Sequence, residues 1–196
     1  MRIDTLAANA GPGSPPAELA ACALFAVLHG AATGELPPFV WTLDLPQERL
    51  LALIGEHLPG TLTATPLSAL HYATLRQQVP RDFRDLLALL LDARAPAVPP
   101  AAAERVARTL AAACFGSRHL WQDLGFSGRG DVSRLLAAYF PALRRANVHD
   151  LKWKRFLFAE LSARRGKAEL FPPNCARCDD FPNCFPGRSR PGAGKT

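Results

Sequence analysis

Apolar residues recur three and four positions apart along most of the chain, the spacing that places them on one face of an α-helix. Six segments show this pattern and are predicted to be helices: Pro16 to about Ala32, Asp44 to Leu58, Asp82 to Ala93, Ala101 to Ala113, Asp131 to Phe140 and Asp150 to Arg164. No segment alternates apolar and polar residues for long enough to indicate a β-strand. The sequence therefore predicts an all-α fold.

Prolines and glycines divide the chain further. Residues 1–15 are rich in Gly, Pro, Ala and Ser and are predicted to be disordered, as is the tail 187–196. Residues 16–170 form the predicted single helical domain. Residues 171–186, called the cysteine loop from here on, carry four prolines, which prevent a continuous helix. We expect this loop to hold too few apolar residues to order itself, and to bind a metal.

Composition narrows the possible classes of protein. A chain of 196 residues that is 48% apolar can build one domain with a real core, because fully burying one large apolar side chain stabilises a fold by roughly 1.5–3 kcal/mol. The longest apolar run, Leu86 to Leu91, is far shorter than the roughly 20 residues that a bilayer requires. Residues 1–16 lack the apolar stretch of a secretory signal. We therefore expect a cytoplasmic protein with no membrane partner.

The formal charge of +6 raises the question of a nucleic-acid partner. Nine of the 23 basic residues lie in or just after the last predicted helix and in the tail: Lys152, Lys154, Arg155, Arg164, Arg165, Lys167, Arg188, Arg190 and Lys195. No helix-turn-helix, zinc-finger or RNA-binding signature accompanies them, so we predict no nucleic-acid partner and interpret the charges as a solvated helix face.

Three of the five cysteines, Cys175, Cys178 and Cys184, are spaced C-x2-C-x5-C within the cysteine loop. An odd number of cysteines in a cytoplasmic chain does not indicate a disulfide framework. Three kinds of site remain open. An iron–sulfur or mixed-metal cluster tolerates three protein thiolates; a structural zinc site usually needs four Cys or His ligands; a redox dithiol would normally lie beside a βαβ unit.

Several blocks of sequence lead into this loop in a fixed order. They are HLWQDLG from His119 to Gly125, YFPAL from Tyr139 to Leu143, Asn147, and KWKRFL from Lys152 to Leu157. Together with the cysteines they resemble the NifQ family of nitrogen-fixation proteins, over about 103–185. The resemblance implies a non-enzymatic molybdenum donor that holds molybdenum in a cluster with iron and sulfide. It also implies two recipients, the NifEN cofactor-assembly scaffold and the NifH iron protein.

The chain departs from the family pattern at one position. That pattern is C-x4-C-x2-C-x5-C, and its first cysteine falls on Leu170, which cannot ligate a metal. Candidate substitutes are His119 and Cys114, with Asp179 or Asp180 inside the loop. Each has a plainer interpretation, since Cys114 could be a small buried apolar residue, His119 a helix cap, and the two aspartates solvated turn residues.

Two functions from different classes follow from these observations. The first is a molybdenum donor for the iron–molybdenum cofactor of nitrogenase, in which Cys175, Cys178 and Cys184 bind the cluster. In that case the basic segment 152–167 is expected to dock an acidic partner or to attract molybdate, a dianion. The second is a zinc-stabilised interaction module that lost molybdenum chemistry with the cysteine at position 170. The sequence shows no nucleophile–base pair and no paired carboxylates. We therefore predict that the protein is not an enzyme.

Overall fold

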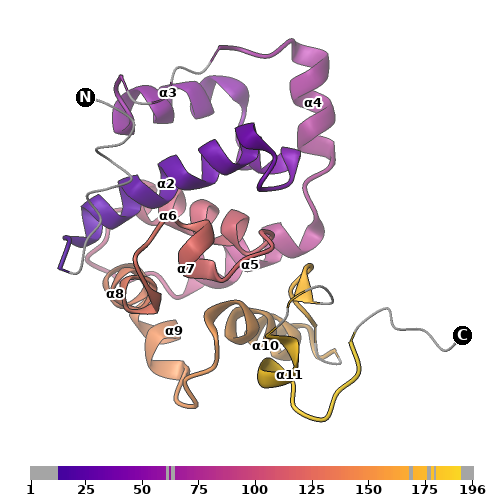
Figure 1. Cartoon of the computed structure of the whole chain (residues 1–196). Helices are drawn as coiled ribbons and strands as arrows, with labels where there is room; N and C mark the ends of the chain where they lie inside the picture. The colour runs from indigo at the N-terminus through magenta and orange to yellow at the C-terminus, as the bar shows by residue number, and fades with distance from the viewer. Residues whose placement is uncertain are drawn as a thin grey trace, which may run out of the picture.

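The computed structural model describes residues 13–60, 62, 65–167, 170–175, 178 and 180–190, and the regular elements among them are all helices (Figure 1). In chain order they are α2 (Pro16–Thr33), the 3-10 helix η1 (Pro38–Thr42), α3 (Gln47–His57), α4 (Ala69–Gln77), α5 (Arg81–Asp92), α6 (Pro100–Ala113), α7 (Leu120–Asp123), α8 (Arg129–Tyr139), α9 (Pro141–Ala146), α10 (Trp153–Arg165) and α11 (Phe181–Cys184). The prediction of an all-α fold is confirmed. The predicted disordered segments lie mostly outside the described residues.

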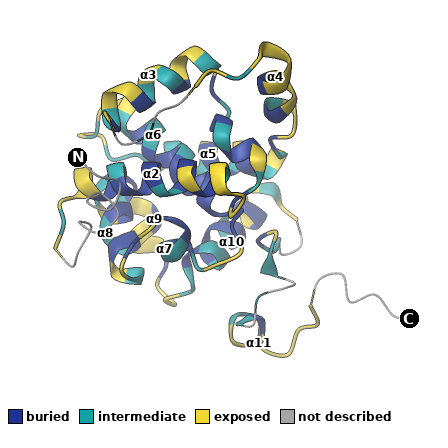
Figure 2. Ribbon diagram, turned by 45° about the horizontal axis from the view of Figure 1, so that its top comes forward, coloured by how far each residue is buried: buried dark blue, intermediate teal, exposed yellow. Residues whose placement is uncertain are grey.

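Helix α2 forms the centre of the domain. It contacts η1, α6, α7 and α8, and Leu19, Leu24 and Leu28 on it are fully buried. By length and composition alone this helix could cross a membrane, with a mean hydropathy of 1.3, yet half of it is buried inside the fold. Its apolar character is thus accounted for by the protein core, which Figure 2 shows as the dark blue interior.

Helices α5 and α6 pack against each other beneath α2, and α10 packs on α5. The face of α5 that points inward carries Phe83, Leu86 and Leu90, all fully buried. These residues recur three and four positions apart, which is why the sequence predicted this helix closely. Burial of such side chains, at roughly 1.5–3 kcal/mol each, holds the helices together without any metal.

Prolines begin several of these helices. Pro16, Pro38, Pro100 and Pro141 all lie in the first turn of their helix. A proline is favoured there because its missing N–H would have no partner inside the helix and its fixed φ suits the helix start. The sequence indicated these prolines mainly as breaks between helices. In the structure they also mark the residues at which helices begin.

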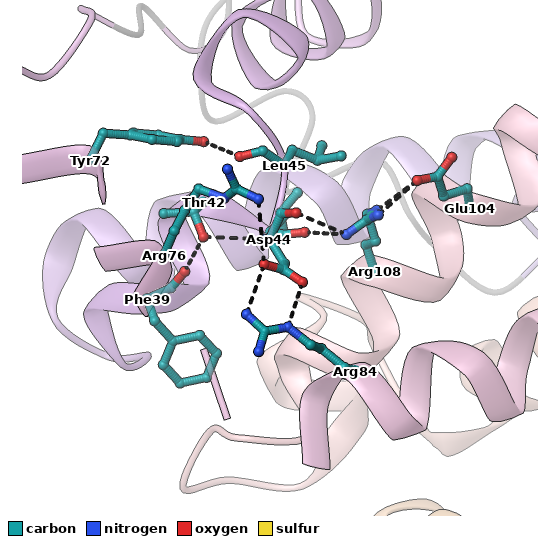
Figure 3. A network of polar contacts seen from close by, with 10 residues as sticks. Phe39, Thr42, Asp44, Leu45, Tyr72, Arg76, Arg84, Glu104 and Arg108 are labelled. Carbon is teal, nitrogen blue, oxygen red and sulfur yellow. Dashed lines mark hydrogen bonds and ion pairs between the residues drawn. The ribbon is translucent and has the colours of Figure 1, made fainter. Parts of the chain in front are cut away.

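A strained turn joins η1 to α3, and a network of polar contacts holds it (Figure 3). Leu43 and Asp44 both adopt positive φ, 46° and 55°, which costs about 1–3 kcal/mol per residue. Thr42 Oγ1 accepts a hydrogen bond from Asp44 N at 3.1 Å, and Arg84 Nε donates to Asp44 Oδ2 at 3.0 Å. Arg108 Nη1 on α6 donates to the Leu43 carbonyl at 2.8 Å. The network fixes the turn against α5 and α6.

Beyond this turn, three aromatic rings lead toward the cysteine loop. Phe39 of η1 packs edge-on against Phe115 with ring centroids 5.3 Å apart, and Phe83 lies 6.4 Å from Phe115. Phe115 lies two residues beyond the end of α6, so the packing fixes the position of the segment that enters the candidate site. Helices α3 and α4 lie at the opposite end of the molecule from α11 (Figure 1).

Candidate metal centre

A cavity of about 230 Å³ opens between the segment that follows α6, the start of α10 and the cysteine loop. Cys175, Cys178 and Cys184 all line it, together with His119 and Asp180. The structure thus brings the three predicted thiols and two of the predicted substitute ligands, His119 and Asp180, to the same cavity.

The cysteine loop has a small aromatic core of its own. Phe171, Phe181 and Phe185 pack together, with ring centroids 4.8 to 6.0 Å apart. Phe181 and Phe185 are each only 2% exposed, and the guanidinium of Arg155 on α10 lies over the Phe185 ring at 4.8 Å. The cysteine loop therefore contains more apolar packing than the sequence analysis expected. Three phenylalanines spread over the loop meet only once it has folded back.

Polar contacts attach the cysteine loop to the helical domain. Ser162 Oγ on α10 accepts a hydrogen bond from the Leu170 N–H at 2.7 Å, where the loop begins. Asn174 Nδ2 donates to the Phe115 carbonyl at 2.8 Å, next to Cys175. Further along the loop, Lys152 forms an ion pair with Asp180. These contacts fix the loop at its start and in its middle.

Helix α11 is a single turn that places Cys184 at its end. Pro182 lies in its first turn, where a proline is tolerated. The Cys184 N–H donates to the Asp180 carbonyl at 3.0 Å, and the Cys178 N–H donates to the Cys175 carbonyl at 3.2 Å. The prolines prevent a continuous helix, as predicted, but they allow these short turns, which point the thiols toward one cavity.

The thiol of Cys175 resists ionisation in the metal-free protein. Burial, together with the neighbouring Cys178 and Cys184, raises its pKa to about 11, while Lys154 acts in the opposite direction. At neutral pH this thiol carries its proton. A metal that binds here must displace that proton, so loading releases acid.

The three thiols surround the cavity and do not converge on one point. Among the residues that the structure describes, no three His, Cys, Asp or Glu side chains are grouped closely enough to hold a single metal ion. A zinc ion needs its four ligands at about 2.0–2.3 Å. Sulfur and imidazole donors set around a cavity suit a larger group that contacts each of them separately.

His119 is positioned by the short helix α7, of which it is the N-terminal flanking residue. Its backbone N–H donates to Gln122 Oε1 at 3.0 Å, and its Nε2 lies 3.6 Å from Asp180 Oδ2. Burial, Lys152 and Lys154 lower the pKa of His119. The imidazole is therefore neutral at neutral pH, the form in which histidine binds metals. It serves as both helix flank and cavity wall, so the two interpretations of this residue are compatible.

A buried ion pair under the cavity was not found from the sequence. Asp123 is 2% exposed, and Lys154 Nζ donates to its Oδ2 at 2.5 Å and to the Gly116 carbonyl at 2.8 Å. A Cβ at position 116 would lie 2.3 Å from the same carboxylate oxygen, so only glycine fits there. The two charged residues fall in the HLWQDLG and KWKRFL blocks, but nothing in the sequence pairs them across 31 positions.

Other predicted ligands take different places. Cys114 is 1% exposed at the end of α6 and does not line the cavity, and burial raises its pKa to about 12. Asp179 lies outside the described residues. Asp180 is a partly exposed turn residue, as interpreted, and its carboxylate in addition contacts Lys152 and His119. Leu170 packs against the hydrophobic core and is not part of the cavity lining.

Most cations of the predicted basic helix face have carboxylate partners. Lys154 pairs with Asp123, Arg164 with Asp92 at 2.6 Å, and Arg165 with Asp82 at 2.7 Å and with Asp85. The interpretation of this helix as a free, solvated basic face therefore needs correction, because much of its charge ties α10 to α5 and α7.

Comparison with known proteins places this geometry in a family. The NifQ family model matches residues 21–186. The chain is 34% identical over 151 residues to Protein NifQ of Azotobacter vinelandii, covering 73% of this chain and 76% of that one. It is 30% identical over 176 residues to Protein NifQ of Rhodobacter capsulatus, covering 89% and 93%. No solved structure matches. The chain belongs to the NifQ family, and this membership implies a role in nitrogen fixation and the processing of molybdenum.

Proposed function

We propose that the chain is a non-enzymatic molybdenum donor that carries molybdenum, iron and sulfide as a cluster for assembly of the nitrogenase iron–molybdenum cofactor. The observation that carries this proposal is the convergence of Cys175, Cys178 and Cys184 on one cavity of about 230 Å³, with His119 on its wall. The cluster is the cargo of the protein. The NifEN scaffold and the NifH iron protein are the recipients that the family implies.

The donor set fits such a cluster. Thiolates are the usual ligands of iron–sulfur clusters, and a cluster presents several metal corners that separate ligands can reach. The three thiols are placed around the cavity in this way, and His119 offers a nitrogen in place of the cysteine absent at position 170. Because Leu170 packs against the core, its lack of a thiol leaves the cavity wall intact.

The surroundings also suit an anionic cargo. A cluster bound by several thiolates carries net negative charge, and nearby cations stabilise it and favour loss of the thiol protons. Lys152, Lys154 and Arg155 line the cavity from the start of α10.

The alternative, a zinc-stabilised interaction module, draws on the missing cysteine at position 170. It requires four donors that meet at one ion. The described donors are spread around the cavity, so the geometry supports the cluster carrier better. The alternative remains as one outcome of the test below.

The test is the metal and sulfide content of protein purified without oxygen from molybdenum-fed cells, with an absorption spectrum. The proposal expects brown protein that contains iron, sulfide and molybdenum. Cys178→Ser is expected to lose all three, whereas Cys22→Ser is the matched control, since Cys22 is buried on α2 and outside this cavity. Colourless protein with one zinc and no sulfide would support the alternative, and full retention of the metals by Cys178→Ser would overturn the proposal.

A further inference from the structure

The cavity that the cysteines line is strongly cationic. Five basic side chains contribute to its wall, namely Arg118, Arg129, Lys152, Lys154 and Arg155. Asp180 is the one carboxylate among the described residues of the lining. A cavity with this imbalance attracts anions by long-range electrostatics, independently of any metal bound by the thiols.

Three of the five cations are already committed to carboxylates outside the cavity lining. Lys154 pairs with Asp123, Arg118 with Glu35 at 2.7 Å and with Asp123, and Arg129 with Asp150 at 2.7 Å. These pairs hold the cavity wall in shape. While its carboxylate partner remains in place, each of these three cations is largely neutralised and attracts an anionic ligand only weakly.

Lys152 and Arg155 differ from the other three. Arg155 lies flat over the Phe185 ring, and among the described residues no carboxylate pairs with it. Lys152 pairs only with Asp180, again within the described part of the chain. Next to them, the Nε2 of His119 faces the same carboxylate at 3.6 Å. Lys152 and His119 thus face one carboxylate of the cysteine loop, and Arg155 lines the same cavity.

Asp180 occupies the position that an oxyanion would take. Its Oδ2 contacts both Lys152 and His119. Its other oxygen, Oδ1, accepts a hydrogen bond from Asn183 Nδ2 at 2.9 Å and stays attached to its own loop. A carboxylate on a loop, facing a lysine and an imidazole, has the charge and oxygen atoms of a small anionic ligand.

We propose that Lys152, His119 and Arg155 form a docking subsite for a tetrahedral oxyanion, and that the Asp180 carboxylate fills this subsite until the oxyanion displaces it. The identity of the physiological oxyanion as molybdate rests on the proposed function. The subsite itself stands on the arrangement of these side chains. It delivers the anion into the same cavity as the thiols, and no bond to sulfur is needed for docking.

The test is calorimetric titration of the metal-free, reduced full-length protein with sodium molybdate, tungstate and sulfate at fixed ionic strength. Asp180→Asn removes the competing charge and is expected to bind molybdate about tenfold more tightly. Lys152→Met is expected to bind at least tenfold more weakly. The matched control is Lys167→Met, which removes an exposed lysine just beyond α10 and outside the cavity, and should bind like the wild type.

The outcomes separate this proposal from the cluster proposal. Cys178→Ser should bind molybdate as the wild type does even though it loses the cluster. Preference for molybdate and tungstate over sulfate would tie the subsite to molybdenum, and equal binding of all three would support a subsite chosen by charge and shape. Unchanged affinity in both Asp180→Asn and Lys152→Met, with circular dichroism showing that both are folded, would overturn it, as would no saturable binding of any oxyanion.

Discussion

The helical core and the cysteine loop are held together by different means. The core around α2, α5 and α6 buries long aliphatic and aromatic side chains in one continuous cluster. The loop has only three phenylalanines of its own and a few polar contacts to α10 and the end of α6. The core is therefore stable without metal, whereas the loop belongs to the less stable parts of the molecule, which open locally and which a ligand can order.

The largest effect is expected from a change in the core. Phe83 is fully buried and contacts both Phe39 and Phe115. Phe83→Ala should lower the free energy of unfolding by about 3–5 kcal/mol, measured by urea denaturation of the metal-free protein. The cluster content per folded molecule should remain that of the wild type. A smaller loss of stability than that of the loop variants below would contradict the division between core and loop.

The next effect concerns the buried ion pair that links α10 to α7. Lys154→Met leaves the buried Asp123 carboxylate without its lysine and is expected to cost about 3 kcal/mol of unfolding free energy. The double variant Lys154→Met/Asp123→Asn should recover part of this loss, because the buried charge is then gone. A double-mutant cycle from urea denaturation measures this coupling. Strictly additive effects would show that the pair does not link α7 to α10.

How far the sequence predicted the core depended on the strength of each hydrophobic pattern. Helix α5 was predicted within one residue at each end because its inward face recurs at helical spacing. Helix α4 was missed because Tyr72 and Leu75 are its only buried residues. The turn at Asp44 was also beyond prediction, since neither Leu43 nor Asp44 signals a positive φ, and the arginines that hold it come from other helices.

The sequence predicted the donor residues of the candidate site, but it did not predict the residues that hold these donors in position. The spacing of Cys175, Cys178 and Cys184 and the neighbourhood of His119 were visible in the sequence, and the structure places these four residues on one cavity. The aromatic core of the loop was not visible, because Phe171 is far in sequence from Phe181 and Phe185 and meets them only through the fold of the loop. Buried ion pairs between residues distant in sequence, such as Asp123 and Lys154, are not visible in the sequence for the same reason.

A change in the loop should have a small effect on global stability and a clear local one. Phe185→Ala removes a side chain that is 2% exposed and contacts Phe171, Phe181 and Arg155. Since the loop can open while the core stays folded, the free energy of global unfolding should fall by less than about 1 kcal/mol. Alkylation of the loop thiols in metal-free protein, followed by mass spectrometry, should be severalfold faster. Leu70→Ala, which trims an exposed residue of α4 that is 80% exposed, is the control and should change neither quantity.

The smallest expected effect is a pH dependence that arises in the core, far from the cysteines. Burial lowers the pKa of His57 on α3, and the positive charge of Arg105 lowers it further, while Glu56 acts in the opposite direction. Arg105 Nη1 donates to His57 Nδ1 at 2.9 Å, a contact that requires a neutral imidazole. The unfolded chain, with an ordinary histidine pKa of about 6.5, therefore binds the proton more readily than the folded protein does.

Stability is then complete above the unfolded pKa and is lost as the pH falls through about 6.5 toward the folded value. His119 shifts in the same direction, so His57→Gln should remove only part of the dependence. Urea denaturation at pH 7.5 and 5.5 should show a smaller loss in His57→Gln than in the wild type, by less than about 1 kcal/mol. His71→Gln, a change at an exposed histidine of α4, should keep the wild-type loss. An identical loss in His57→Gln would show that the contact with Arg105 does not couple protonation to folding, and would leave His119 as the histidine whose lowered pKa accounts for the acid sensitivity.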